Sequence, residues 1–573
     1  MKKDLLIILL LILPSVSWLV QPGYFAMHDD MQSIRQFQLD KCFIDLQIPC
    51  RWVPDLGYGY GYPLFNYYPP LPYLVGQLYR WTGAAYIDVV KLVGITGFIT
   101  TAVFMYLLSR EFWGRRGGLV SAAFYTYAPY HSVDYYVRGA ANEFWAMAFF
   151  PAIFWTTYRL IKSTKNTGAK NTPGVVLNTS GVAAWTPPRW TPWVAFSVAG
   201  LMLSHNPMLM IFAPALLAWC LFWIIRLRAP RSFLTLGLSA AWALGLAAFF
   251  TLPVLFESKF VSLWTLTSGY FNYLAHFLDI KQIFLNINWG YGSSELGPGD
   301  SMSFALGYLH WLIPAAILIL TPFVKKLRDH KYLILFLVSC ILGSLFLAHS
   351  KATPIWLVIK PLEFLQFPWR FLTLAVFCAS FLSGALGLIP KRLLLSCSFT
   401  LLLLLNANYF RPRAWYPDMT DAQKFSGQSW QLLVTSGIFD YLPVWAPQPP
   451  ADPAGSDLGF VAGEGTFTRL AKRSNYQAYR LDVASPAATV ELQTYYFPGW
   501  RVWVDGVEQG IDPSRDKLLG RIQVDLASGQ HNLIARFTDT PIRTLGNLLS
   551  MVSWAGIGIM IVWTRRLPSV TST

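Results

Sequence analysis

Long apolar segments recur along most of this chain, and short basic segments separate many of them. The chain is 54% hydrophobic and 13% charged, whereas soluble proteins carry roughly 25% charged residues. A transmembrane helix needs about 20 predominantly apolar residues. We therefore expect a polytopic α-helical membrane protein with about 12 spans. The segments approaching that length are 5–20, 88–109, 118–137, 142–160, 191–204, 207–225, 232–256, 303–324, 332–349, 371–389, 393–410 and 545–564.

The position of the basic residues decides what the formal net charge of +15 means. If the spans alternate in direction, the basic segments all lie on one side of the membrane, as the positive-inside rule requires of the cytoplasmic side. We expect cytoplasmic termini and no nucleic-acid partner. Residues 5–20 are either a retained helix or a cleaved signal peptide, because Ser15-Val16-Ser17 fits a small-residue cleavage site. The basic segments are 1–4, 110–117, 161–190, 226–231, 325–331, 391–392 and 565–573.

The outer segments include one that is long enough to form a domain. From about Gly465 it alternates with strand period, and Asp505-Gly506 is a hairpin-turn signal. We expect a transmembrane domain at 1–410, an extracytoplasmic antiparallel β-sandwich domain within 411–543, and a final helix with a basic tail at 544–573. The predicted strands include Tyr479–Val483, Ala488–Leu492, Arg501–Val504, Arg521–Leu526 and Asn532–Phe537.

The first outer segment, 21–87, carries several unusual features. Residues 69–82 are too short to span and fit a helix lying at the membrane interface. Cys42 and Cys50 share this segment, so an oxidising exterior permits a disulfide between them. The other four cysteines, Cys220, Cys340, Cys378 and Cys397, fall in apolar segments, where a free thiol behaves as a small hydrophobe.

Asp29 and Asp30 form an acidic pair close to the membrane surface. Carboxylates in such a place must stay solvated or find a cation. One interpretation is that one of them caps the helix that follows, with Arg35 as its ion-pair partner. The other is a general base or metal-binding carboxylate, with His28 as a hydrogen-bonding neighbour.

Further candidate residues lie at the outer ends of the spans. Arg138 and Glu143 flank the start of a span, where Arg beside helix N-terminal amides can bind phosphate; the alternatives are a helix-dipole interaction for Glu143 and snorkelling for Arg138. His205 lies in a tight turn before Pro207. Glu363 and Arg370 lie in a proline-rich segment that is too short to cross, where Arg370 can face a lipid phosphate or act as an interface anchor.

Several motifs together resemble the GT-C superfamily of polyprenyl-phosphate-dependent glycosyltransferases. They are the acidic pair, YYPPLPY at 67–73, MYLLSREFWG at 105–114 and GGLVSAAFYTYAPY at 117–130. Two further segments are similar to a bacterial membrane family labelled pyruvoyl-tetrahydropterin-synthase-related and to its YfhO-like relatives: FPWRF at 367–371 and YYFPGWRVWVDG at 495–506. The label does not imply pterin chemistry, because no trio of histidines for its zinc site is apparent.

The resemblance implies a GT-C-like fold in a bacterial inner membrane and an inverting transfer of sugar from a polyprenyl-phosphate donor to an extracytoplasmic acceptor. Asp29 or Asp30 would act as the base. His28, Arg138, Glu143, His205, Glu363 and Arg370 would bind substrate, with Arg138 or Arg370 stabilising the departing phosphate.

Three points stay open at the level of the sequence. Many GT-C enzymes carry a spaced DxD or a DE pair where this chain has DD, so the sequence does not decide whether Asp29 and Asp30 hold a divalent cation such as Mg²⁺ or Mn²⁺. One alternative function is a non-catalytic glycan-binding envelope protein that uses the β-domain and the aromatic loop. Another is a lipid or glycan flippase, although such a path usually contains ionisable residues deep within spans.

Overall fold

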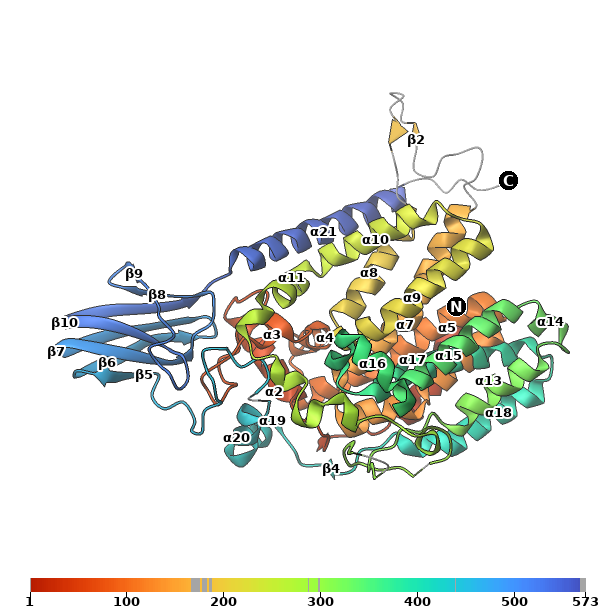
Figure 1. Ribbon diagram of the computed structural model, residues 1–573, viewed down its shortest axis with the longest axis horizontal. Helices are drawn as coiled ribbons and strands as arrows, with labels where there is room; N and C mark the ends of the chain where they lie inside the picture. The colour runs from red at the N-terminus through yellow and green to blue at the C-terminus, as the bar shows by residue number, and fades with distance from the viewer. Residues whose placement is uncertain are drawn as a thin grey trace.

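The structure is a computed structural model that describes residues 2–165, 176–177, 183–184, 188–286, 288–296, 299–437 and 439–566. Helices fill most of the molecule, and a β-sheet projects from one end (Figure 1). The first half of the chain contains α1 (Lys2–Val16), α2 (Gln32–Ile44), α3 (Leu64–Tyr67), α4 (Leu71–Arg80), α5 (Tyr86–Thr126), α6 (Pro129–Ser132), α7 (Ala141–Lys165), α8 (Thr191–Met202), α9 (Asn206–Leu227), α10 (Ser232–Leu246), α11 (Ala248–Glu257) and α12 (Ile280–Phe284). The second half contains α13 (Tyr308–Leu320), α14 (Lys325–Arg328), α15 (Lys331–Ala348), α16 (Thr353–Val358), α17 (Leu372–Ser383), α18 (Arg392–Asn406), α19 (Asp421–Lys424), α20 (Gly427–Thr435) and α21 (Pro541–Arg566).

Helices occur at every predicted span, but fewer of them have the length and composition of a span. Among the described residues, four helical segments are long and apolar enough to cross a membrane: Tyr86–Thr126, Asn206–Leu227, Lys331–Ala348 and Pro368–Leu388. The pair α10 and α11 makes a fifth if its 78° bend lies within one span. These helices support a multi-pass membrane protein, and the count of 12 spans is not shown.

Breaks in the backbone account for much of this difference. Two predicted spans are joined in α5, whose single non-helical residue is Gly114 at φ 70°. Glycine tolerates a positive φ at no steric cost, so the chain can turn there between two helical parts. The second part ends at Thr126, and a short π-helix at Val133–Arg138 completes the predicted segment.

Aromatic side chains pack the helical part together around α7, α9 and α17. The rings of Phe150 and Phe212 stack at 4.3 Å between centroids, and those of Phe154 and Trp219 stack at the same distance. Phe377 packs edge-on against this group. Because lipid is as apolar as these rings, van der Waals packing between helices stabilises such a bundle more than burial from water does.

The C-terminal strands form one six-stranded antiparallel sheet in the order β5-β7-β10-β8-β9, with β6 also paired to β7. The predicted β-sandwich of two sheets is therefore corrected to a single sheet. The two long strands, β7 and β10, run through both halves of this sheet. Apolar residues from both halves, such as Leu481 and Val490, pack in one core. The sheet thus folds over its own core, and no second sheet is needed. Its strands are β5 (Leu458–Ala462), β6 (Gly465–Arg473), β7 (Tyr476–Tyr495), β8 (Trp500–Val504), β9 (Val507–Gln509) and β10 (Arg521–Phe537).

The predicted hairpin turn joins β8 to β9. Asp505 and Gly506 both have positive φ, 52° and 84°, and Val504 pairs with Val507. Two consecutive positive φ values are typical of a type I′ turn, for which Asp-Gly is a favoured sequence. Four strands of two residues lie outside this sheet: β1 (Tyr24–Phe25) pairs with β4 (Trp415–Tyr416), and β2 (Val176–Leu177) pairs with β3 (Ala183–Ala184).

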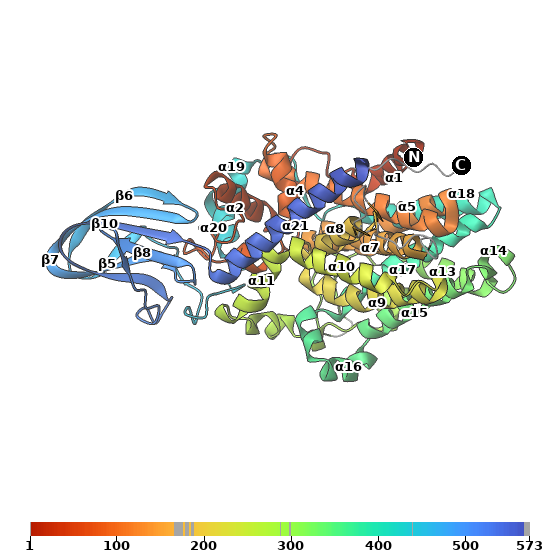
Figure 2. The same cartoon turned by 90° about the horizontal axis from the view of Figure 1, so that it is seen from above.

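The first outer segment lies between the helices and the sheet (Figure 2). Its Trp52 packs against Phe497, Trp500 and Phe537 in the core of the sheet. Cys42 and Cys50, the pair that the sequence places together, form a disulfide. The sheet and this segment therefore share a core. The predicted domain boundary at 410 and 411 stays a prediction.

Candidate functional site

A cavity of about 1270 Å³ lies where the first outer segment meets the ends of the helices. Most of the predicted site residues line it: His28, Asp29, Asp30, Arg138, Glu143, His205 and Arg370. Glu363 is not among the residues that line it, although its neighbours Phe364 and Gln366 are. The cavity thus brings together side chains from segments that are far apart in the sequence.

A close backbone contact places Asp29 beside Arg138. The Asp29 N–H donates to the Arg138 carbonyl at 2.8 Å, and the His28 N–H donates to the Val137 carbonyl at 2.9 Å. Gly139, at φ +68°, follows at once, and a Cβ there would lie 3.0 Å from the Asp29 carbonyl oxygen. Only glycine fits this approach without strain.

The Asp29 side chain pairs with side chains of α2, the helix that follows, and Asp29 does not cap that helix. The N-cap of α2 is Met31, which makes no side-chain cap bond, so the capping interpretation is wrong. Instead Arg35 Nη1 lies 2.7 Å from Asp29 Oδ2, and Gln32 Nε2 donates to the same oxygen at 3.2 Å. The other oxygen, Oδ1, accepts no hydrogen bond within the described part of the chain. The Asp29 side chain is 36% exposed.

Asp30 has a different partner. Lys424, from the C-terminal region, lies 2.5 Å from Asp30 Oδ2. Asp30 Oδ1 is buried and has no hydrogen-bond partner among the residues that the structure describes. Burial raises the pKa of Asp30, and Lys424 opposes that rise. Oδ2 of Asp30 is therefore paired with Lys424, and Oδ1 is buried away from solvent.

Glu143 holds two arginines together at the opposite side of the cavity. Arg138 Nη1 lies 3.1 Å and Arg370 Nε 3.0 Å from the same oxygen, Glu143 Oε2. Tyr130 donates its hydroxyl to Oε1 at 2.6 Å, and Arg138 also pairs with Asp134. We call these five residues the arginine cluster. The Glu143 side chain is fully buried, so its charge requires such partners.

The segment before the Arg370 helix fixes its guanidinium. Arg370 Nη1 donates to the Leu365 carbonyl at 2.7 Å and to Gln366 Oε1 at 3.1 Å. Gln366 adopts φ 63°, a sharp turn that lets its side chain reach back to Arg370. Arg138 lies over the ring of Trp369 at 4.5 Å. Arg138 Nε and Nη2 and Arg370 Nη2 donate no hydrogen bond within the described residues.

His205 and His28 line the cavity, and each also makes a hydrogen bond to the backbone. His205 is the N-cap of α9, and its Nδ1 accepts from the Met208 N–H at 3.3 Å. Burial lowers the pKa of His205 to about 3, so it is neutral at physiological pH. His28 Nε2 lies 2.8 Å from the Tyr291 carbonyl oxygen. That contact ties the acidic pair to the 257–302 segment.

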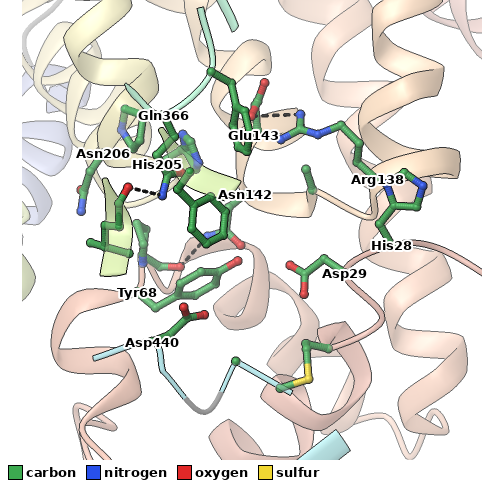
Figure 3. Close-up of a pocket in the computed structure, with 18 of the residues that line it drawn as sticks. His28, Asp29, Tyr68, Arg138, Asn142, Glu143, His205, Asn206, Gln366 and Asp440 are labelled. Carbon is green, nitrogen blue, oxygen red and sulfur yellow. Dashed lines mark hydrogen bonds and ion pairs between the residues drawn. The ribbon is translucent and has the colours of Figure 1, made fainter. Parts of the chain in front are cut away.

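Asp440 also lines the cavity, and the sequence analysis missed it. Figure 3 shows it below Tyr68, on the same side of the cavity as Asp29. Burial raises the pKa of Asp440 to about 6, and the charge of Asp29 adds to the rise while Arg35 opposes it. Asp440 lies far from the acidic pair in the sequence, among apolar and aromatic residues in GIFDYLPVW at 437–445, and this segment carries no motif that points to the site. Asp29, Asp30 and Asp440 are called the carboxylate side below.

Part of the cavity is apolar and open. Its lining includes side chains that remain well exposed, among them Leu255 at 69%, Leu432 at 60%, Phe439 at 51% and Phe364 at 43%. Exposed apolar side chains around a cavity mark a ligand or membrane contact more often than ordinary surface. The lining of the cavity thus combines charged side chains with exposed apolar ones.

The described residues do not fit a divalent cation. They contain no group of three or more His, Cys, Asp or Glu side chains that could hold a metal ion. Asp29 and Asp30 are directed to different cations, Arg35 and Lys424. Mg²⁺ and Mn²⁺ prefer several oxygen ligands around one point, and these two carboxylates do not supply them in this arrangement.

Comparisons with known proteins give distant similarities. No family model matches the chain. An uncharacterized protein of Lactococcus lactis subsp. cremoris (strain MG1363) is 25% identical over 224 residues, which are 38% of this chain and 33% of that protein. The chain thus spans about a third of the curated relative it matches.

Two solved structures of the mycobacterial arabinofuranosyltransferase AftD, one of them a mutant, are similar over 73% of this chain at 13% identity. The TM-scores are 0.43 and 0.42, and the matches cover 27% and 28% of those chains.

Proposed function

We propose that the cavity is the active site of an inverting GT-C-type glycosyltransferase, which moves a sugar from a polyprenyl-phosphate donor to an extracytoplasmic acceptor. The observation that carries the proposal concerns the lining of one cavity. It brings together a carboxylate with one oxygen free of hydrogen bonds to described residues, a pair of arginines and exposed apolar side chains. These are the groups that a base, a departing phosphate and a lipid chain require.

Asp29 is the better candidate for the base. A general base must come within hydrogen-bond distance of the hydroxyl whose proton it takes. Asp29 keeps Oδ1 for an acceptor while Arg35 holds Oδ2. Asp30 has one oxygen on Lys424 and the other buried. In the proposed step the acceptor oxygen bonds to the anomeric carbon as the bond from that carbon to the phosphate oxygen breaks, and the hydroxyl proton goes to Asp29.

Arg138 and Arg370 would receive the negative charge of the departing phosphate. They converge on one oxygen of Glu143, which fixes the two guanidiniums side by side and leaves donors on each. Fixed cations at the place where charge develops stabilise a transition state by a few kcal/mol. Glu143 acts here as a positioning residue. The exposed apolar side chains of the lining, such as Leu255 and Phe439, would accept part of the lipid chain.

Replacing each carboxylate by its amide tests the proposal. Asp29→Asn keeps the size of the side chain and removes the basic oxygen, so we expect a stable, membrane-inserted protein whose sugar transfer falls by about 10²- to 10⁴-fold. Asp30→Asn is the matched control, and we expect it to keep most of the transfer. The measurement is transfer of radiolabelled sugar from a polyprenyl-phosphate donor pool in membranes that carry each variant.

Two results would count against the proposal. If Asp29→Asn and Asp30→Asn both transfer at the wild-type rate, neither carboxylate is the base. If the wild-type protein transfers no sugar from any donor offered, the cavity serves binding without catalysis. Arg138→Lys and Arg370→Lys extend the test, because a single ammonium does not replace a planar guanidinium at a phosphate.

A further inference from the structure

The outward face of the β-sheet carries a regular arrangement of arginines. Residues such as Tyr479, Leu481, Val502 and Leu533 point into the core and are buried. Side chains alternate between the two faces of a strand, so the residues between them point outward. Figures 1 and 2 show this sheet extending from the end of the molecule, away from the helices.

One row of outward residues crosses four neighbouring strands. The register pairs Arg501 with Arg536, Arg536 with Tyr476, and Tyr476 with Arg473. The three arginines are exposed. Neighbouring strands lie about 4.8 Å apart, and like charges directly opposite each other destabilise a sheet. The pairing of Arg501 with Arg536 is therefore costly unless anions balance both charges.

The next outward row is mainly apolar. Trp503 pairs with Ile534, Ile534 with Ala478, and Ala478 with Ala471. Trp503 is half-buried and lies beside the arginine row on β8. It belongs to no core cluster and makes no ring contact within the described part of the chain, so one side of its indole is available.

Acidic side chains only partly balance this face. Glu508 lies 3.3 Å from Arg501. Asp482 and Asp525 also point outward on these strands, and Asp525 is paired with Arg515. Arg473, Arg480 and Arg536 form no ion pair with any described residue. Arg480 extends the cationic area, because it lies opposite Asn532 in the row beyond Trp503.

We infer that this outward face binds an acidic polysaccharide. Its carboxylate or phosphate groups would lie on the row of Arg473, Arg536 and Arg501, since a guanidinium matches such groups with two parallel hydrogen bonds. A sugar ring would pack on Trp503, as apolar sugar faces do on aromatic rings. The alternation of a cationic row with an aromatic row fits a polymer of charged sugars. The inference does not depend on the proposed transfer reaction.

Binding of the full-length protein, purified in nanodiscs of neutral lipid, tests the inference. The probe is polygalacturonate, with neutral dextran as the reference polymer and binding measured at several salt concentrations. We expect the double variant Arg501→Gln/Arg536→Gln to bind the acidic polymer about tenfold more weakly or worse, and Trp503→Ala to weaken it as well. Arg501→Lys/Arg536→Lys keeps the charge and should retain part of the binding.

Arg469→Gln is the matched control, because Arg469 is as exposed as Arg501 but lies opposite the core-facing Tyr479, on the other face of the sheet. It should bind like the wild type. Equal binding by the wild type and the Arg501/Arg536 double variant would overturn the inference. So would binding of the wild type to anionic vesicles of phosphatidylglycerol and not to polygalacturonate, which would assign the face to a membrane surface. Equal binding to dextran and polygalacturonate would also overturn it, because the arginines would then have no role.

Discussion

The two sides of the cavity hold their charges in different ways. In the arginine cluster, Glu143 is fully buried and Arg370 is 8% exposed, and their charged atoms are engaged with one another. On the carboxylate side, Asp29 and Asp30 are 36% and 37% exposed, and each has a single cationic partner. The charges of the first arrangement are largely buried, and those of the second are partly exposed to solvent.

This difference has a physical cause and a consequence. A buried charge loses its hydration and is tolerated only with good partners, so the arginine cluster must be complete for the protein to fold. A half-exposed carboxylate keeps part of its hydration, so its partner can be changed at little cost in stability. Substitutions in the cluster should therefore lower stability as well as transfer, whereas Asp29→Asn should lower transfer with little loss of stability.

Removing the charge of Glu143 is the strongest test of this contrast. Glu143→Gln keeps the shape of the side chain but leaves Arg138 and Arg370 near each other with Asp134 as the remaining carboxylate of the cluster. We expect a loss of about 3–5 kcal/mol in the free energy of unfolding, measured by denaturation in detergent.

Glu363→Gln is the control, because Glu363 is half-buried, lies outside the cavity and makes no ion pair with a described residue; it should change stability by less than about 0.5 kcal/mol. Equal unfolding of the two variants would contradict the contrast.

The carboxylate side has a covalent support of its own, with a smaller expected effect. The Cys42–Cys50 disulfide closes a short loop after α2, the helix whose Arg35 pairs with Asp29. For a loop of this size chain entropy suggests a contribution of about 2–3 kcal/mol. Cys42→Ser/Cys50→Ser should lower the melting temperature, and reductant should do the same to the wild type. Cys397→Ser, which alters an exposed free cysteine, should do neither; if it destabilises as much as the double variant, the disulfide is not the cause.

Much of the helical fold could be predicted from the sequence, because the length of an apolar segment is a local property. Each predicted span coincides with a helix, and the Asp505-Gly506 turn joins the predicted strands. Crossing a membrane is harder to predict, since α8 and α13 are helical and apolar yet short. The single folded sheet also escaped prediction. Strand period does not reveal that β7 and β10 run through both halves.

The site was partly predictable for a similar reason. Arg138, Glu143 and Arg370 lie at the ends of apolar segments, where a charge stands out in the sequence. Asp29 and Arg35 are only six residues apart, so their pairing is a local contact. Lys424, however, comes from a polar segment in which charged residues are ordinary, and Asp440 comes from a separate segment, GIFDYLPVW, that matches no motif. Only the tertiary structure brings them to the acidic pair, so no local pattern could have found them.

The smallest expected effect concerns Asp440, because its carboxyl group can bind and release a proton on the carboxylate side of the cavity. Burial raises its pKa from 3.8 to about 6, so the folded protein holds this proton more tightly than the unfolded chain does. Between about pH 4 and 6 the folded state therefore binds more protons, and its stability falls as pH rises. Asp440→Asn removes the titrating group, and we expect the melting temperature at pH 4 minus that at pH 7 to fall by about 1–2 °C. Thermal unfolding of the two proteins in the same detergent measures it, with Asp452→Asn as a control for a carboxylate that does not line the cavity. An unchanged pH dependence in Asp440→Asn would mean that Asp440 is ionised and solvated in the folded protein, and that it adds no proton equilibrium to the carboxylate side.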